Sequence, residues 1–259
     1  MIAWPFDPTV YAGLVALPLA YAWLASTAGD VERRHAVTFG LGLLALWVAL
    51  ETPVDTISDD YLDSVHMFQH VLLGFIAPPL MLLGLSPGMA ARLGAVPLIR
   101  ALTEPVPAQL IAGGVMVVWH VPALYDATLH SEPLHVAEHV MFIAAGLALF
   151  WPVLAVTSAT SRRQLSPVAV LLYLLVATIP QDGVALALLF SRVPFYEYYT
   201  HVPRLLPTMT PLIDQTVAGA VLMVLGKATM AVAGLAVFFR WFGEEQRNDR
   251  AEPRIRLGT

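Results

Sequence analysis

The sequence predicts an all-α integral membrane protein, a bundle of seven transmembrane helices. Of its 259 residues, 58% are hydrophobic and only 13% are charged, whereas soluble domains carry about 25% charged residues. The apolar residues also gather in seven stretches that approach or exceed the roughly 20 residues needed to cross a bilayer. We therefore expect one membrane domain over residues 1–241 and a charged cytoplasmic tail over residues 242–259.

Proline and glycine residues separate the seven apolar stretches, because both interrupt helices. In chain order, the joins contain Pro53, Pro87 with Gly88, Pro105 and Pro107, Pro133, Pro167, and Pro207 with Pro211. The second stretch is short, and the last is longer than a bilayer requires. The predicted spans are residues 9–27, 36–53, 63–85, 107–127, 133–155, 167–190 and 212–241.

Arginine residues orient the predicted bundle. Eleven arginines follow spans 1, 3, 5 and 7, whereas only Arg192 and Arg204 lie on the opposite side. Cytoplasmic loops carry the excess of Lys and Arg, so we expect the N-terminus outside and the C-terminus in the cytoplasm. Lys227 falls inside the last span, about 20 Å below Asp214 by helical rise. We expect it in the inner half of the membrane, away from the histidines and carboxylates.

Two loops have a distinctive composition. Loop 86–106 on the cytoplasmic side is mildly amphipathic, and we expect it to hold a short helix in the membrane interface. Outer loop 191–211 is rich in aromatic residues and proline. We favour an aromatic belt at the headgroup level for this loop, and the alternative is a lid over an outward-facing site.

Five of the eight histidines lie in or beside the predicted spans. Residues four apart share one helix face, so His66 pairs with His70 on span 3 and His135 with His139 on span 5. His120 lies near the outer end of span 4. In the predicted orientation His70, His120 and His139 lie about 10 Å inside the outer surface, and His66 and His135 lie nearer to it. Ionisable residues within membrane spans are by default functional candidates.

These residues predict a metal centre, because neutral imidazole is the commonest metal ligand. The chain has no cysteine, which excludes disulfides, iron–sulfur clusters and thiolate sites. Thioether combined with imidazole favours copper, particularly Cu(I). We predict one or two copper ions held by His66, His70, His120, His135, His139, Met67 and Met116.

Three carboxylates, Glu138, Asp182 and Asp214, are expected to orient ring N–H groups or to act as additional ligands. For Asp182 and Asp214 the alternative is helix capping or pairing with Arg192 and Arg204.

Other functions share parts of this pattern. Residues 135–139 (HVAEH) match the H-x-x-E-H motif of zinc proteases. Membrane di-iron oxygenases also use H-x-x-x-H pairs, and His70 with His139 would suffice to ligate a haem. A lysine in the seventh span is typical of retinal proteins, and Asp182 with Lys227 would suit a proton-coupled transporter. The net charge of -5 argues against nucleic acid as a partner.

Several stretches together carry a family resemblance: residues 66–70 (HMFQH) with Leu72-Leu73 and Ala77-Pro78-Pro79-Leu80, residues 119–126 (WHVPALYD), residues 135–139 with Gly146 and Trp151-Pro152, and Asp214-Gln215 with Ala218-Gly219. They resemble the multi-pass CtaG family of cytochrome c oxidase assembly factors. The resemblance implies a seven-helix protein of the bacterial plasma membrane that is not an enzyme and helps to mature the oxidase. The implied partners are oxidase subunits and an extracytoplasmic copper chaperone. The metal ligands above are inferred from the residues themselves.

Overall fold

The computed structural model describes residues 4–251, and every regular element in that range is helical. Five helical segments are long and apolar enough to cross a membrane. They are α1 (Pro8–Ala28), the segment Asp63–Leu83, α10 (Glu132–Phe150), α12 (Pro167–Phe190) and α14 (Pro211–Ala251). The prediction of an all-α, multi-pass membrane protein is therefore confirmed.

Two bent helix pairs bring the number of spans to as many as seven. Helix α2 (Arg33–Leu50) bends by 42° into α3 (Pro53–Asp60), and α8 (Pro105–Trp119) bends by 79° into α9 (Pro122–Thr128). Prolines cause both breaks, because the residue before a proline is pushed out of the helical region. Predicted span 36–53 therefore ends at the first break, close to the end of α2, whereas predicted span 107–127 runs across the second break and is not one continuous helix.

The other expected boundaries lie close to the observed ones. Helix α12 coincides with predicted span 167–190, whereas α14 continues ten residues beyond predicted residue 241. The first part of the expected tail is thus helical, and residues 252–259 lie outside the described range. Loop 86–106 contains two short helices, α6 (Pro87–Ala95) and α7 (Pro97–Leu102), where one was expected. The remaining short helices are α11 (Ala155–Ser158) and α13 (Tyr198–His201).

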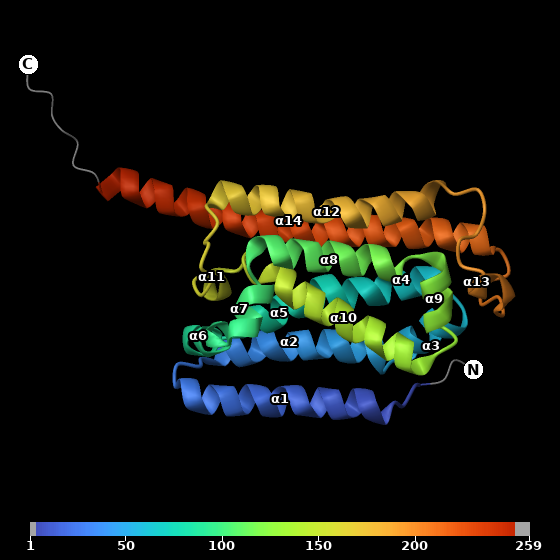
Figure 1. Ribbon diagram of the computed structural model, residues 1–259, viewed down its shortest axis with the longest axis horizontal. Coiled ribbons are helices and arrows are strands. Elements are labelled where there is room, and N and C mark those ends of the chain that lie inside the picture. The colour runs from blue at the N-terminus through green and yellow to red at the C-terminus, as the bar shows by residue number, and fades with distance from the viewer. Residues whose placement is uncertain (1–3, 252–259) are drawn as a thin grey trace, which may run out of the picture.

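Segment Asp63–Leu83 occupies the centre of the bundle: 72% of its most apolar stretch is buried, against 6% for α1. It packs against α2, α10 and α14, and α12 lies along α14. Figure 1 shows α1 on one side and α12 with α14 on the other. Helices α3, α9 and α13 gather at one end of the bundle, which we call the histidine end, and α6, α7 and α11 lie at the other.

The central segment is not a regular helix. It consists of α4 (Asp63–Val71), the π-helix η1 (Leu72–Ile76) and α5 (Ala77–Leu83). Pro78 and Pro79 have no backbone N–H and cannot bond the carbonyls of Gly74 and Phe75. The Ala77 N–H instead donates to the Leu72 carbonyl, five residues back. The wide turn begins at Leu72, two residues after His70, and such turns are frequent at functional sites.

Gly146 lets α10 approach this π-helix closely. A Cβ at Gly146 would overlap the Gly74 carbonyl oxygen and would lie 2.6 Å from Pro78 Cγ. The neighbour is backbone within a buried segment, so it cannot move aside as a flexible side chain would. Contact between these helices therefore requires glycine at position 146.

Gly146→Ala is expected to lower the free energy of unfolding by about 1–3 kcal/mol, as overpacking typically does. Thermal unfolding of the detergent-purified protein measures the loss. Gly114→Ala on α8 is the matched control, because nothing lies within 4 Å of a Cβ added there. Equal melting temperatures for the two variants would show that the close approach is not needed.

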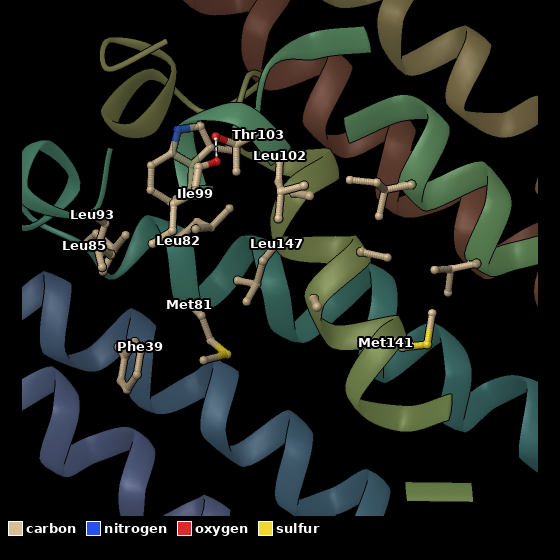
Figure 2. Close-up of a pocket in the computed structure, with 16 residues that line it drawn as sticks. Phe39, Met81, Leu82, Leu85, Leu93, Ile99, Leu102, Thr103, Met141 and Leu147 are labelled. Carbon is tan, nitrogen blue, oxygen red and sulfur yellow. Dashed lines mark hydrogen bonds between the residues drawn. The ribbon is translucent and has the colours of Figure 1, made fainter. Parts of the chain in front are cut away.

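An apolar cavity of about 450 Å³ lies near the α6 and α7 end (Figure 2). Its lining includes Met81, Leu85, Leu147 and Met141, and the Thr103 hydroxyl is already donated to the Ile99 carbonyl. It contains no histidine and no carboxylate. This cavity therefore offers no ligands for a metal ion.

Candidate metal centre

The five predicted histidines meet at the histidine end of the bundle. His66 and His70 lie on α4, His135 and His139 on α10, and His120 ends α8 at its bend. Neighbouring rings have centroids 4.1 to 6.3 Å apart, from His135–His139 to His66–His139. All five are buried, with 0–7% of their surface exposed. Three separate helices thus place their histidines in one cluster.

Two groups within the cluster are close enough to share an ion. One nitrogen each from His66, His135 and His139 lies within 4.8 Å of the others, and the same holds for His66, His70 and a Glu138 oxygen. His66 belongs to both groups. His66 was expected nearer the surface than His70, but it is fully buried at the centre of the cluster. The predicted division into a deep set and a shallow pair concerns depth in the membrane and stays a prediction, but within the protein His66 is as buried as His70.

Tyr199 fixes the proton on His66. Burial raises the pKa of Tyr199 well above its usual range, so the phenol keeps its proton. The hydroxyl donates to the Ser58 carbonyl at 2.6 Å, and its oxygen lies 3.0 Å from His66 Nδ1. The phenol oxygen therefore accepts the Nδ1 proton, and the neutral ring has a lone pair on Nε2. That Nε2 atom is buried without a hydrogen-bond partner among the described residues.

His120 is oriented in the same way. Its Nδ1 lies 2.7 Å from the Met116 carbonyl, which can only accept, so Nδ1 carries the proton of the neutral ring. The unprotonated Nε2 then faces the sulfur of Met67 at 3.3 Å. Two electron-pair donors that face one another form no hydrogen bond, but both can bind a soft cation. The Met67 sulfur thus lies beside His120, whereas Met116 meets His120 through its carbonyl oxygen, and both methionine side chains belong to the apolar core.

Asp59 approaches the third ring. Its Oδ2 lies 3.4 Å from His135 Nδ1, and Ser58 Oγ donates to its other oxygen at 2.8 Å. The Nε2 atoms of His135 and His139 are buried without a hydrogen-bond partner in the described chain. Buried polar atoms normally have partners, and these three unpaired imidazole nitrogens lie in one group that could hold a metal ion.

Glu138 lies beside the second group. Its Oε1 is 3.4 Å from His70 Nε2, and neither carboxylate oxygen has a hydrogen-bond partner within residues 4–251. The sequence suggested either an orienting role or an additional ligand for this residue. Its position with His66 and His70 suits the ligand role.

Asp214 lies behind the cluster and caps the helix that carries two of the histidines. Its carboxylate accepts the backbone N–H groups of Asp63 at 2.8 Å and Ser64 at 3.1 Å. These N–H groups belong to the first turn of α4, where a negative charge also stabilises the helix dipole. The capping alternative for Asp214 therefore holds, and it fixes the start of the helix that bears His66 and His70.

Asp182 has a different neighbour from the one expected. Its Oδ2 lies 3.2 Å from Lys227 Nζ, and no histidine pairs with it. The prediction that Lys227 lies away from the carboxylates was wrong. The first turns of α14 extend beyond the last turn of α12, so Lys227 on α14 lies level with Asp182 on α12. Eight residues separate Asp182 from Phe190, whereas sixteen separate Lys227 from Pro211.

The aromatic loop covers the cluster instead of forming a belt. Tyr196 and Tyr199 are each only 2% exposed, and the Tyr196 ring stacks on Tyr125 with centroids 3.7 Å apart. Asp126 accepts the backbone N–H of Glu197 at 3.1 Å, and Gln215 accepts that of Phe195 at 2.6 Å. The belt interpretation is therefore wrong for these two tyrosines, and the lid interpretation describes them.

Sequence reasoning missed Tyr199, Tyr125 and Asp59. Tyr125 donates to Asp63 Oδ1 at 2.8 Å, and its ring centroid lies 5.0 Å from that of His66. The aromatic character of loop 191–211 was the one available signal for Tyr199. Nothing in the local sequence around Asp59 identifies a partner on α10.

The fold and the cluster define a class: a multi-pass helical membrane protein with a buried, histidine-rich group of potential metal ligands. A family profile described as cytochrome c oxidase caa3 assembly factor (Caa3_CtaG) matches residues 18–244. The chain belongs to this family, as the motifs around the histidines predicted. Comparison with curated proteins gave no significant match, and comparison with solved structures gave none either.

Proposed function

We propose that the protein is a copper-binding assembly factor that helps to metallate or mature cytochrome c oxidase, with no enzymatic activity of its own. The family supports the role in oxidase assembly. Copper is the cargo, held by the histidine cluster and passed on by ligand exchange. Oxidase subunits would receive it, and an extracytoplasmic copper chaperone would supply it.

The proposal of a metal site depends on one observation. The Nε2 atoms of His66, His135 and His139 lie unpaired in one buried group. The proposal that this metal is copper depends on the types of donor atom present. Imidazole binds several transition metals, but the Met67 thioether opposite His120 favours a soft ion such as Cu(I).

The two groups that share His66 offer alternative positions for an ion, because the single free nitrogen of His66 binds one ion at a time. His135 and His139 complete the first group. His70 and Glu138 complete the second, and the His120 ring lies 5.4 Å from His70 between centroids. The cluster thus offers more donors than a single Cu(I) requires.

The membrane orientation belongs to the same proposal. With seven spans and the arginine-rich loops in the cytoplasm, the histidine end faces outward from the bacterial plasma membrane. Copper would then be gained and released on the extracytoplasmic side.

A haem between His70 and His139 fits less well. Their centroids are 6.1 Å apart, but the His66 ring lies 4.5 Å from His70, and Phe142 stacks on His70 at 4.3 Å. These side chains occupy the space that a flat macrocycle would need. A di-iron oxygenase is disfavoured too, because the histidine boxes of the membrane enzymes face the cytoplasm and contain more histidines, whereas the proposed orientation places the five clustered histidines outside.

A zinc protease requires closer comparison. His66 supplies the third ligand that the H-x-x-E-H motif lacks in the sequence. Glu138, however, lies with His70, is fully buried and does not face an open position where a water could attack a substrate. Family membership also suggests a non-enzymatic role.

Metal analysis of the purified full-length protein, with its absorption spectrum, tests the proposal. We expect one to two copper ions per chain and no Soret band. A Soret band would indicate haem, iron without one would indicate an oxygenase, and zinc alone would revive the protease. Protein that neither contains copper nor takes up added Cu(I) would overturn the assignment.

A further inference from the structure

A cavity of about 380 Å³ connects the surface with the histidine cluster. It lies between the segment that precedes α1, helix α3 and the start of α10. His135 and His139 form part of its lining. Both are more than nine-tenths buried, and both have an Nε2 without a hydrogen-bond partner in the described chain. The cavity therefore reaches the first group of ligands.

The lining of this cavity is strongly acidic. Asp7, Asp55, Asp59 and Glu132 contribute four carboxyl groups, and no lysine or arginine is among the lining residues. Two of these side chains are held in place: Asp55 accepts the Gln69 amide at 2.8 Å, and Asp59 lies 3.4 Å from His135. The exposed carboxylate of Glu132 at the mouth of the cavity would raise the local concentration of a cation and speed its association.

The second cavity at this end does not serve the cluster. It is lined by residues of α9, α13 and the following turn, including Asp126, His130 and Glu197, and by none of the five clustered histidines. Acidic character alone therefore does not distinguish the first cavity. Its distinguishing feature is the pair of unpaired imidazole nitrogens at its inner wall.

We propose that the cavity between the N-terminal segment, α3 and α10 is the vestibule through which a metal cation reaches the histidine cluster. The proposal rests on the proposed function, whose metal site it supplies. Carboxylates attract a cation but hold a soft one weakly, whereas imidazole and thioether bind it better. From the surface inward, the available donors change from the carboxylates of the cavity wall to the imidazoles of His135, His139 and His66. They then change to His120 with the thioether of Met67. A copper ion would therefore move inward by ligand exchange without a conformational change.

The rate of copper uptake tests this path. The probe is Cu(I) supplied from a coloured chelator, mixed rapidly with the copper-free full-length protein. Val136 lines the cavity on α10, so Val136→Phe should obstruct it and slow uptake by about tenfold or more, with the final copper content unchanged. Val140→Phe is the matched control: it lies one turn further along α10, is 57% exposed and does not line the cavity.

A charge variant supports the test without adding bulk. Glu132→Gln should slow uptake by about two- to threefold at low salt, with the difference disappearing at high salt because ions screen exposed charges. Asp60→Asn is its control, an exposed carboxylate on α3 outside the lining. Uptake by Val136→Phe and Glu132→Gln at the wild-type rate would overturn the vestibule alone. A wild-type protein that takes up no copper would instead overturn the proposed function.

Discussion

His66→Ala is expected to remove nearly all bound copper, a larger loss than any other single substitution in the cluster produces. His66 is the one residue common to both groups of potential ligands. His139→Ala breaks only the first group and His70→Ala only the second. Because the single lone pair of His66 binds one ion at a time, copper should still bind to the second group in His139→Ala and to the first group in His70→Ala, so each variant should retain more copper than His66→Ala. Metal analysis of the purified variants gives the pattern directly.

The matched control for His66→Ala is His130→Ala. His130 lies at the same end of the bundle but is exposed and outside the cluster, so its removal should leave the copper content unchanged. Thermal unfolding of the copper-free proteins separates ligand loss from misfolding. Full copper content in a folded His66→Ala variant would contradict the shared-ligand arrangement.

Tyr199→Phe is expected to weaken copper binding by about 10–100-fold, although the phenol is not itself placed as a ligand. Partners that orient a ligating histidine typically contribute this much to metal affinity. The hydroxyl is held by the Ser58 carbonyl and in turn accepts the proton of His66 Nδ1. Without it, the His66 ring is free to turn or to change tautomer, and Nε2 is no longer kept unprotonated. Competition with a Cu(I) chelator measures the affinity.

Tyr198→Phe is the control for this variant. Tyr198 is adjacent on α13, only partly buried, and its ring packs against His130, not against the cluster. Its hydroxyl should be dispensable for copper. The Tyr199→Phe protein should still bind copper in the same final amount when copper is in excess. Unchanged affinity would mean that Tyr199 only closes the fold over the cluster.

Local sequence explains why several features could be predicted in advance. The pairs His66–His70 and His135–His139 depend only on helical periodicity, since residues four apart always share a face. The apolar stretches and their proline joins similarly depend on near neighbours. The join at Pro53 was predicted, whereas the break before Pro122 was not, and the bend angles of 42° and 79° depend on how the segments pack.

The partners of Asp214 and Asp182, in contrast, could not be predicted from local sequence. Asp214 and Asp182 lie on neighbouring helices, and the sequence offered the same alternatives for both. In the structure Asp214 caps α4, 151 residues away from Asp63 in the chain, and Asp182 pairs with Lys227. The relative displacement of α12 and α14 decides these partners, and no local pattern encodes it.

The sequence by itself thus determined a helical membrane protein of an oxidase assembly family, with five histidines on shared faces near one end. Only the tertiary structure decided that His66 belongs to both groups, that Tyr199 and the Met116 carbonyl leave specific nitrogens unprotonated, and that a cavity with acidic residues reaches His135 and His139. The physical reason is the range of the interactions. Periodicity and backbone preferences act within a few residues, whereas a ligand site needs atoms from segments that only packing brings together.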